Sequence, residues 1–358
     1  MEGNPMWLPI GALLVPAIIW MMPVEGLAQR EAFKVGEIEA TAGTRASGFL
    51  EVAAKAGVDN GTRIPVTVIH GAKAGTVLAL IAGTHGYEYS PIVAMQMFPA
   101  KVDPLELAGT IIVVHVANPP SFFGRTVYYS PVDGKNLNRV YPGRADGTIS
   151  ERIADQITRE VIDRANYVID LHCGDGNEAL RPYVYWEAVG TPEVQEKSKR
   201  LALAFGLEHI VIQTDRVTDV SKTMYTSTTA IARGKGAITS ETGLLGRVDT
   251  DGAKLAEAGV FNVLRSLKML PGEARVVENP KWIEQSEVLR SPITGVFHAR
   301  VQPGQAVVEG ALLGVLTDLF GNTVREVCVP FEGEVLYVVA TPPVSQGEPL
   351  GMVGRIRK

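Results

Sequence analysis

The sequence has very few cysteines, with only Cys173 and Cys328 among 358 residues. This number excludes the dense disulfide scaffold that holds many small secreted domains together. The two cysteines lie in different parts of the chain, and we interpret them as isolated thiols, although an exported protein would be able to oxidise them as one pair. Folding must then depend on a hydrophobic core, for which the 46% hydrophobic content is ordinary.

The sequence also lacks an excess of positive charge. Its formal net charge is -5 at pH 7 and its pI is near 5.8. A basic surplus is what neutralises phosphates, so nucleic acid is not expected as a partner. A small-molecule substrate must instead be recognised by local charges. The length suits one large domain with a smaller one attached.

Charge is absent from the apolar run between Trp7 and Val24, and the small residues Gly26-Leu27-Ala28 follow it. Residues 1–28 are therefore predicted to be an export signal that is cleaved before Gln29, which places the protein in the periplasm or outside the cell. The segment before the run contains Glu2 and no Lys or Arg. A membrane anchor formed by residues 7–24 is the competing interpretation, and only then is a membrane a partner.

Residues 29–285 contain short apolar segments that alternate with helix-compatible stretches. This alternation predicts an α/β domain with a largely parallel sheet. The expected strands are residues 63–70, 77–82, 110–116, 167–171 and 237–240, and the expected helices are residues 91–98, 150–164, 192–205 and 252–269. Ser150 followed by Glu151 is a candidate start for one helix.

The helical pattern is lost near the C-terminus, where residues 286–358 consist of short β-type runs separated by Gly and Pro. These features predict a small all-β barrel or sandwich. Two turn-centred units resemble each other as in the lipoyl and biotinyl carrier barrels. The corresponding hairpin, Leu316 to Val324, has no Lys to carry a prosthetic group, which leaves a structural role or a role as a lid.

Polar residues directly follow four of the predicted strands: His85 and Glu88, Asn118, His172 and Glu241. Ligands in open α/β sheets bind at the carboxyl ends of strands, so these side chains are expected to converge. An imidazole and a carboxylate three residues apart are able to bind one metal ion. A catalytic zinc usually has three protein ligands and an open fourth position, so His172 is the natural third ligand.

A second group of motifs lies between these residues. It comprises Asn118-Pro119, Gly124-Arg125, Asn136-Leu137-Asn138-Arg139 and Tyr141-Pro142-Gly143. Together with the metal pattern, it resembles the succinylglutamate desuccinylase and aspartoacylase family of the zinc carboxypeptidase superfamily. The resemblance covers roughly residues 60–350 and includes the C-terminal β domain that several members carry. It implies a zinc-carboxypeptidase-like, mixed and largely parallel sheet flanked by helices.

The resemblance also implies a set of roles. One zinc ion per chain is held by His85, Glu88 and His172, and Glu241 transfers protons during hydrolysis of an amide bond. Arg125 polarises the substrate carbonyl, whereas Asn138 and Arg139 bind the substrate carboxylate. The expected reaction is removal of an acyl group from a small N-acyl amino acid or amine, by a water molecule that the zinc activates.

One position departs from the family pattern, because Asn136 replaces the usual Asp of Asp-Leu-Asn-Arg. Asn donates as well as accepts hydrogen bonds, so the support of the metal site and the substrate preference are open at this point. Asp170 lies two residues before His172 on the same predicted strand face and could orient that ligand. A satisfied polar residue at the sheet edge is the alternative for Asp170.

Two other functions fit the same residues. A zinc carboxypeptidase or amidase could act on peptides, which export would make accessible. A catalytically inactive protein could use Arg139 to bind a carboxylate, but the presence of every expected catalytic position argues against it. The oligomeric state is left open. Four further histidines have no partner at metal-ligand spacing and are interpreted as core or surface residues: His70, His115, His209 and His298.

Overall fold

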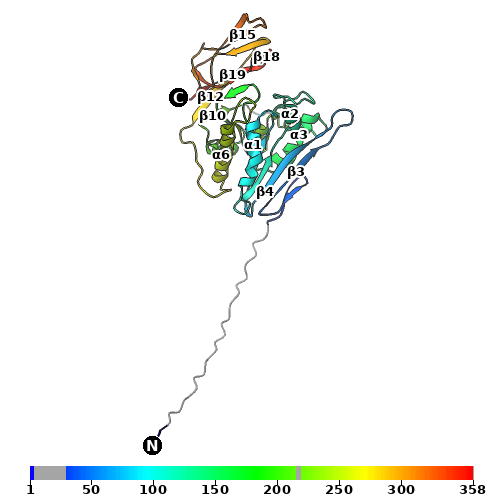
Figure 1. Ribbon diagram of the computed structural model, residues 1–358, viewed down its shortest axis with the longest axis vertical. Helices are drawn as coiled ribbons and strands as arrows, with labels where there is room; N and C mark the ends of the chain where they lie inside the picture. Colours follow the sequence, from blue (N-terminus) through cyan, green and yellow to red (C-terminus); the bar gives the residue numbers. More distant parts are fainter. Residues whose placement is uncertain (4–29, 215–218, 358) are drawn as a thin grey trace.

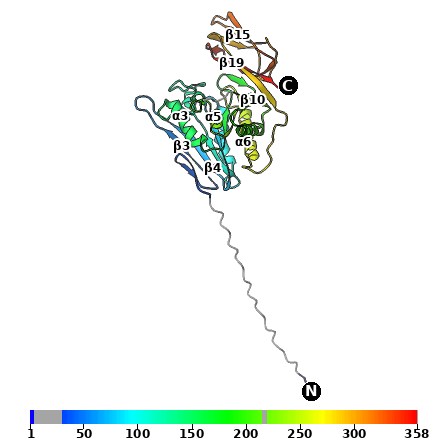
Figure 2. The same ribbon diagram turned by 180° about the vertical axis from the view of Figure 1, so that it is seen from behind.

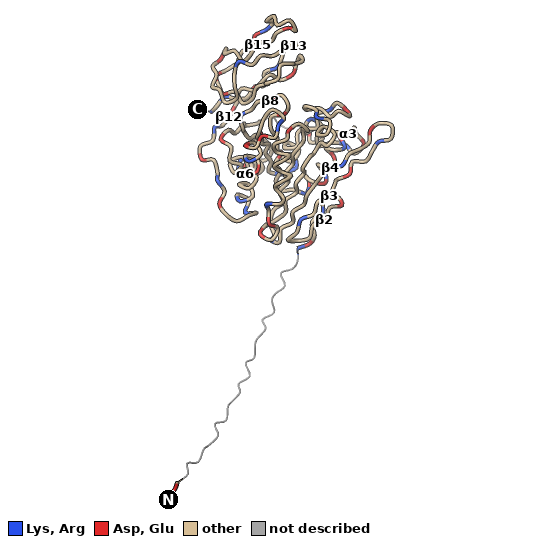
Figure 3. Tube along the Cα trace, viewed as in Figure 1, with Lys and Arg blue, Asp and Glu red and all other residues tan. Residues whose placement is uncertain are grey.

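The computed structural model describes residues 1–3, 30–214 and 219–357 (Figure 1). Almost all of the predicted export signal, including the apolar run at residues 7–24, lies outside these ranges. Within the described residues, no helix has the length and apolar character needed to cross a membrane. Lys and Arg are interspersed with Asp and Glu along the described chain (Figure 3).

A large mixed sheet forms the centre of the molecule, and four consecutive strands within it are parallel. In sheet order they are β6 (Ala108–Val114), β5 (Lys73–Ala82), β7 (Tyr167–His172) and β11 (Gly236–Glu241). All four occur where the sequence predicts strands. Their carboxyl ends lie at one edge of the sheet, which is where the candidate site is built.

Antiparallel strands extend this central part on both sides. On one side, β4 (Thr62–His70) pairs with β6, and β3 (Thr44–Val52) pairs with β4. On the other side, β9 runs antiparallel to β11, and β10 and β12 follow in parallel. The bounds of these three strands are Tyr183–Glu187, His209–Gln213 and Lys281–Arg290. The α/β class is confirmed, with parallel pairing concentrated in the centre of the sheet.

Helices cover both faces of the sheet because buried strand residues point alternately to each face. Leu78 and Leu80 belong to one apolar core with α1 and α6, whereas Ala79 and Ile81 belong to the other core with α3 and α5 (Figures 1 and 2). The helices are α1 (Tyr89–Met97), α2 (Pro119–Gly124), α3 (Ile149–Ile157), α4 (Pro192–Phe205), α5 (Thr226–Ala232) and α6 (Thr250–Ser266). Single turns of other helix types are η1 (Phe98–Lys101), η2 (Leu137–Arg139) and η3 (Thr158–Ile162).

The start of α3 differs from the sequence-based expectation. Its N-cap is Thr148, whose backbone N–H donates to Oε2 of Glu151 at 2.8 Å. Ser150 lies inside the first turn, where its hydroxyl donates to Asp133 at 2.8 Å. Glu151 is therefore at the third helical position of a capping box that begins at Thr148, two residues before Ser150.

The C-terminal residues form the expected β-rich unit, in which two sheets pack around one apolar core. One is the end of the large sheet, with β14 (Ala306–Val307), β17 (Gly333–Val339) and β19 (Pro349–Ile356). The other contains β13 (Gly295–Ala299), β15 (Leu312–Thr317), β16 (Thr323–Cys328) and β18 (Pro343–Val344). The predicted domain boundary after residue 285 falls within β12, which pairs with strands of both parts.

The remaining short strands are β1 (Phe33–Val35), β2 (Ile38–Ala40) and β8 (Glu178–Leu180). Both cysteines are free, with Cys173 buried and Cys328 exposed. The histidines that were interpreted as core or surface residues each form a hydrogen bond or ion pair elsewhere in the fold. Their partners are Thr110 for His70, Thr67 for His115, Glu334 for His209 and Thr317 for His298.

Candidate functional site

The candidate site lies at the carboxyl ends of β5, β7 and β11. His85 follows β5 after a turn at Gly83, which has a positive φ of 73°, and Glu88 is the residue that precedes α1. His172 is the last residue of β7 and Glu241 is the last residue of β11, and the two are paired in register. Convergence of the strand ends thus brings together residues that are up to 156 positions apart in the sequence.

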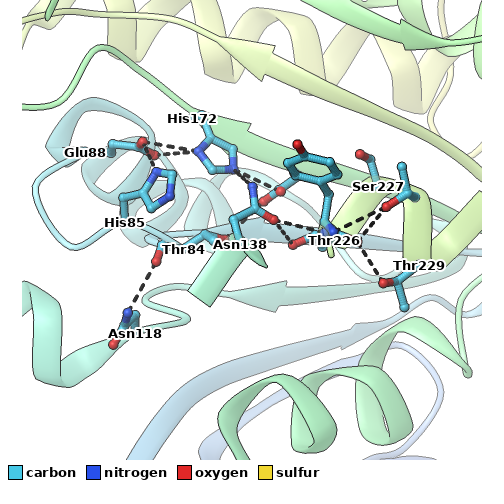
Figure 4. Close-up of polar contacts among 12 residues, drawn as sticks. Thr84, His85, Glu88, Asn118, Asn138, His172, Thr226, Ser227 and Thr229 are labelled. Carbon is cyan, nitrogen blue, oxygen red and sulfur yellow. Dashed lines mark hydrogen bonds and ion pairs between the residues drawn. The ribbon is translucent and has the colours of Figure 1, made fainter. Parts of the chain in front are cut away.

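Two imidazoles and one carboxylate form a compact, buried cluster (Figure 4). Nδ1 of His85 lies 2.6 Å from Oε1 of Glu88, and Nδ1 of His172 lies 2.9 Å from Oε2 of the same carboxylate. One ligand atom from each of the three residues lies within 4.8 Å of the others. His85, Glu88 and His172 therefore have the geometry to hold a metal ion.

The far side of each imidazole is held by an oxygen atom. Nε2 of His85 lies 3.1 Å from Oδ1 of Asn136, and Nε2 of His172 lies 2.9 Å from Oδ2 of Asp170. Thr84 in turn donates its hydroxyl to Asp170 at 3.2 Å. An acceptor at Nε2 keeps the proton there and directs the lone pair of Nδ1 toward the centre of the cluster, as metal-binding histidines require.

Charges in the cluster favour a cation at its centre. Burial alone would raise the pKa of Glu88, but His172 and His85 outweigh it and lower this pKa to about 2. Burial acts to lower the pKa of His172, and the carboxylates of Asp170 and Glu88 raise it well above its ordinary value. A metal cation would replace the proton that these carboxylates attract to His172. The donor set therefore fits a divalent metal such as zinc.

Glu241 is a half-buried residue beside the cluster. Burial raises its pKa well above the ordinary value for Glu; Glu88, Glu178 and Asp170 act in the same direction, whereas His172 opposes them. A carboxyl group with a raised pKa is able both to accept and to return a proton near neutral pH. This position suits the acid and base role expected from the sequence.

Two acidic residues near the cluster, Glu178 and Asp175, were not predicted as site residues. Burial raises the pKa of Glu178 to about 7, although the hydroxyl of Tyr128, which donates to it at 2.5 Å, acts in the opposite direction. Asp175 is fully buried, and burial raises its pKa well above the usual range. The two acids follow His172 closely, Asp175 in the loop after β7 and Glu178 at the start of β8, and this position was the available sequence signal.

Arg125 lies at the C-terminal end of α2 in the left-handed conformation, with a φ of 52°. It lines a cavity of about 850 Å³ together with Tyr128 and Asn177. Gly295 and Val344 of the C-terminal β unit form part of the opposite wall. Both parts of the chain thus contribute to this cavity, and Tyr128 connects it to the cluster, because the centre of its ring lies 5.8 Å from that of His85.

Asn138 and Arg139 have different surroundings. The side-chain oxygen of Asn138 accepts hydrogen bonds from the backbone and hydroxyl of Thr226 at 3.0 and 3.3 Å, and its Nδ2 lies 3.4 Å from Nε2 of His172 (Figure 4). Asn138 therefore reaches the metal cluster. Arg139 is exposed, donates to its neighbour's carbonyl at 2.7 Å and lies over the ring of Tyr225 at 4.7 Å.

Known proteins resemble the chain over most of its length. The N-alpha-acetyl-L-2,4-diaminobutyric acid deacetylase of Halomonas elongata is 27% identical over 300 residues, which cover 82% of this chain and 86% of that protein. The product-bound ectoine utilization protein EutE (DoeB) of Ruegeria pomeroyi is 26% identical, with a TM-score of 0.78 over 87% of this chain and 95% of the other. An aspartoacylase family protein of Mesorhizobium loti is 27% identical, with a TM-score of 0.75 over 92% and 98%.

The family itself follows from a match to more than half of the sequence. Residues 74–267 match the model of the succinylglutamate desuccinylase/aspartoacylase catalytic domain. This span begins within β5, ends just after α6 and contains Arg125, Asn138, Glu241 and the cluster of His85, Glu88 and His172. The chain therefore belongs to the succinylglutamate desuccinylase/aspartoacylase family, whose characterised relatives carry the names of deacylases.

Proposed function

We propose that the protein is a zinc-dependent hydrolase that removes an acyl group from a small N-acyl amino acid or related amine. The observation that carries this proposal is the buried His85, Glu88 and His172 cluster with Glu241 beside it on the neighbouring strand. The deacetylase of Halomonas elongata acts, according to its name, on an acetylated diamino acid. A substrate of similar size would fit the cavity described above.

Each residue has a defined task in this proposal. His85 and His172 would hold the metal through Nδ1 and Glu88 through its carboxylate. Bound zinc supplies a Lewis acid and lowers the pKa of a bound water molecule to about 7. Glu241 accepts a proton from the attacking water and returns it to the nitrogen of the leaving amine, which prevents the amine from leaving as an anion.

Positively charged and amide groups complete the site. Arg125 lines the cavity, and its guanidinium would stabilise the negative charge that develops on the carbonyl oxygen. Nδ2 of Asn138 has a donor available for the substrate because Thr226 occupies only the oxygen of that amide. Arg139 would bind the substrate carboxylate after leaving the ring of Tyr225.

The shape of the entrance supports a small substrate. Residues of the C-terminal β unit form one wall of the cavity, which would restrict the approach of an extended peptide. We further propose that this unit is a barrel of the carrier type without a prosthetic group, and that residues 1–28 direct export. These two proposals are independent of the hydrolase chemistry.

The test is hydrolysis of a panel of N-acetyl and N-succinyl amino acids by zinc-loaded protein, together with metal analysis. The His85→Ala variant is expected to lose both zinc and activity. Glu241→Gln should retain zinc and lose roughly 100-fold or more in kcat, because proton transfer is removed while the metal ligands remain.

Exposed residues far from the cluster provide matched controls. The variants His298→Ala and Glu309→Gln change the same residue types in the C-terminal unit and should keep both zinc and turnover. The absence of bound zinc in the wild-type protein, or full turnover by Glu241→Gln, would refute the proposed function.

A further inference from the structure

Asp175 is an acidic residue whose side chain has no satisfactory partner. It is fully buried, and neither carboxylate oxygen completes a hydrogen bond of normal geometry in the described structure. The backbone N–H of Asn177 stabilises its charged form to some extent. Burying a carboxylate without hydrogen-bond partners is strongly unfavourable, so such a group calls for an explanation.

The charges around Asp175 make this arrangement more unfavourable. The charged side chains that act on it most strongly are Glu178, Glu88 and Glu241, all of which are acidic. His85 and His172 act to lower the pKa of Glu178 when they are charged, but imidazoles are neutral when they bind a metal. With Asp170, five carboxyl groups lie near the cluster, and a zinc ion would offset only two negative charges.

Asp175 and Glu178 are close to residues of the cavity that Arg125 and Tyr128 line. Gly176 and Asn177, which directly follow Asp175, line this cavity, and so does Tyr128. The hydroxyl of Tyr128 donates to Glu178 at 2.5 Å and fixes that carboxyl group at the same side of the site. Both acids are therefore adjacent to residues that line the cavity, Asp175 along the chain and Glu178 through its hydrogen bond with Tyr128.

We propose that Asp175 and Glu178 bind a cationic group, an alkylammonium, on the amine half of the substrate. An ammonium has three donors and one positive charge, so it would satisfy the free oxygens of Asp175 and offset the excess of acids. A second metal ion is a weaker candidate, because Asp175 is not among the residues whose ligand atoms converge within 4.8 Å. This inference rests on the proposed amide hydrolysis and specifies its substrate class.

Matched substrates that differ only in this charge provide the test. The first pair is Nα-acetylornithine and Nα-acetylnorleucine, and the second is the Nα-acetyl derivatives of 2,4-diaminobutyrate and norvaline. In each pair a methyl group replaces the ammonium. We expect zinc-loaded wild-type protein to prefer the charged member of at least one pair by roughly tenfold or more in kcat/KM, which is the effect of one charged hydrogen bond.

The variants Asp175→Asn and Glu178→Gln should reduce this preference, mainly by raising KM for the charged substrate. Glu309→Gln, an exposed acid in the C-terminal unit, is the control and should keep the preference. Thermal unfolding and zinc content show whether each variant is folded. Two separate variants keep the test decisive if one of them does not fold.

The outcomes separate the two proposals. Equal kcat/KM for the charged and neutral members of both pairs would refute the ammonium site and leave the hydrolase function intact. If no acyl compound is hydrolysed, the proposed function fails, and calorimetric binding of free ornithine and norleucine decides the inference. Tighter binding of ornithine that is lost in Asp175→Asn supports it, and equal binding of the two amino acids overturns it.

Discussion

The two imidazoles of the candidate metal site, His85 and His172, are supported by different residues. Asp170, a carboxylate, accepts from Nε2 of His172, whereas Asn136, a neutral amide, accepts from Nε2 of His85. A carboxylate increases the electron density of the imidazole that donates to it more than an amide does. His85 is therefore the weaker of the two nitrogen ligands. The Asp that the family usually has at position 136 would remove this difference.

We expect Asn136→Asp to bind zinc more tightly than the wild-type protein, by roughly tenfold, because it makes His85 a better ligand. Competition with a zinc chelator at constant pH measures this affinity independently of turnover. The new carboxylate still accepts the hydrogen bond that Asn138 N–H donates at 2.8 Å, so the local fold is preserved. Asn60→Asp, at an exposed position, is the control. An unchanged dissociation constant in Asn136→Asp would contradict this account.

At the scale of elements, α3 is attached to the loop that connects β3 and β4 by one buried ion pair. Arg152 donates to Asp59 at 2.7 Å and to the carbonyl oxygen of Ala53 at 3.2 Å. The exposed fractions of the two charged side chains are only 8% and 3%. Burial would raise the pKa of Asp59, but hydrogen bonds from Arg152 and Gly61 outweigh it, so the pKa is lower than usual.

Replacing Arg152 by Leu should destabilise the protein by roughly 3 kcal/mol, because Asp59 is left charged and buried without its partner. Urea unfolding at neutral pH measures this difference, with Arg325→Leu as an exposed control.

The lowered pKa of Asp59 also predicts a pH effect. Its stabilisation is complete above about pH 4 and is lost as the pH falls through the lower folded-state pKa. The difference between wild type and Arg152→Leu should therefore shrink in acid, and a constant difference would argue against this ion pair.

At the scale of the whole molecule, one sheet continues from the catalytic part into the C-terminal β unit. β12 pairs with β10 on one side and with β19 on the other, and β8 pairs with β17. Apolar residues of both parts, including Leu180, Val211, Leu336 and Met352, share one core. Glu334 of the C-terminal unit also lies 3.0 Å from Nε2 of His209 and 3.2 Å from Nε of Arg181. The two units are therefore coupled.

This coupling predicts a single unfolding transition in differential scanning calorimetry for the wild-type protein. Zinc should shift the whole transition to higher temperature, because it binds the folded state in preference to the unfolded state. Removal of zinc by a chelator should reverse the shift. Two separate transitions, with only the first sensitive to zinc, would show that the C-terminal unit folds independently.

The sequence by itself determined the local features of the protein. Apolar periodicity predicts β4, β5, β6, β7 and β11, since the alternation of buried residues is a local property of a strand. The positions of His85, Glu88, His172 and Glu241 at strand ends predict their convergence, because parallel strands end at the same edge of a sheet. The family motifs indicate the catalytic domain that the matched residues 74–267 confirm.

Only the tertiary structure decided which side chains meet across loops. Asn136 supports His85 across 51 positions, and Tyr128 holds Glu178 across 50 positions. Loop side chains have no periodic pattern, so their partners depend on how distant elements pack. The same reason explains the burial of Asp175 without a partner and the extension of the sheet through β12 into the C-terminal unit. Local sequence thus placed the residues of the candidate metal site, and long-range packing set the charge balance around them.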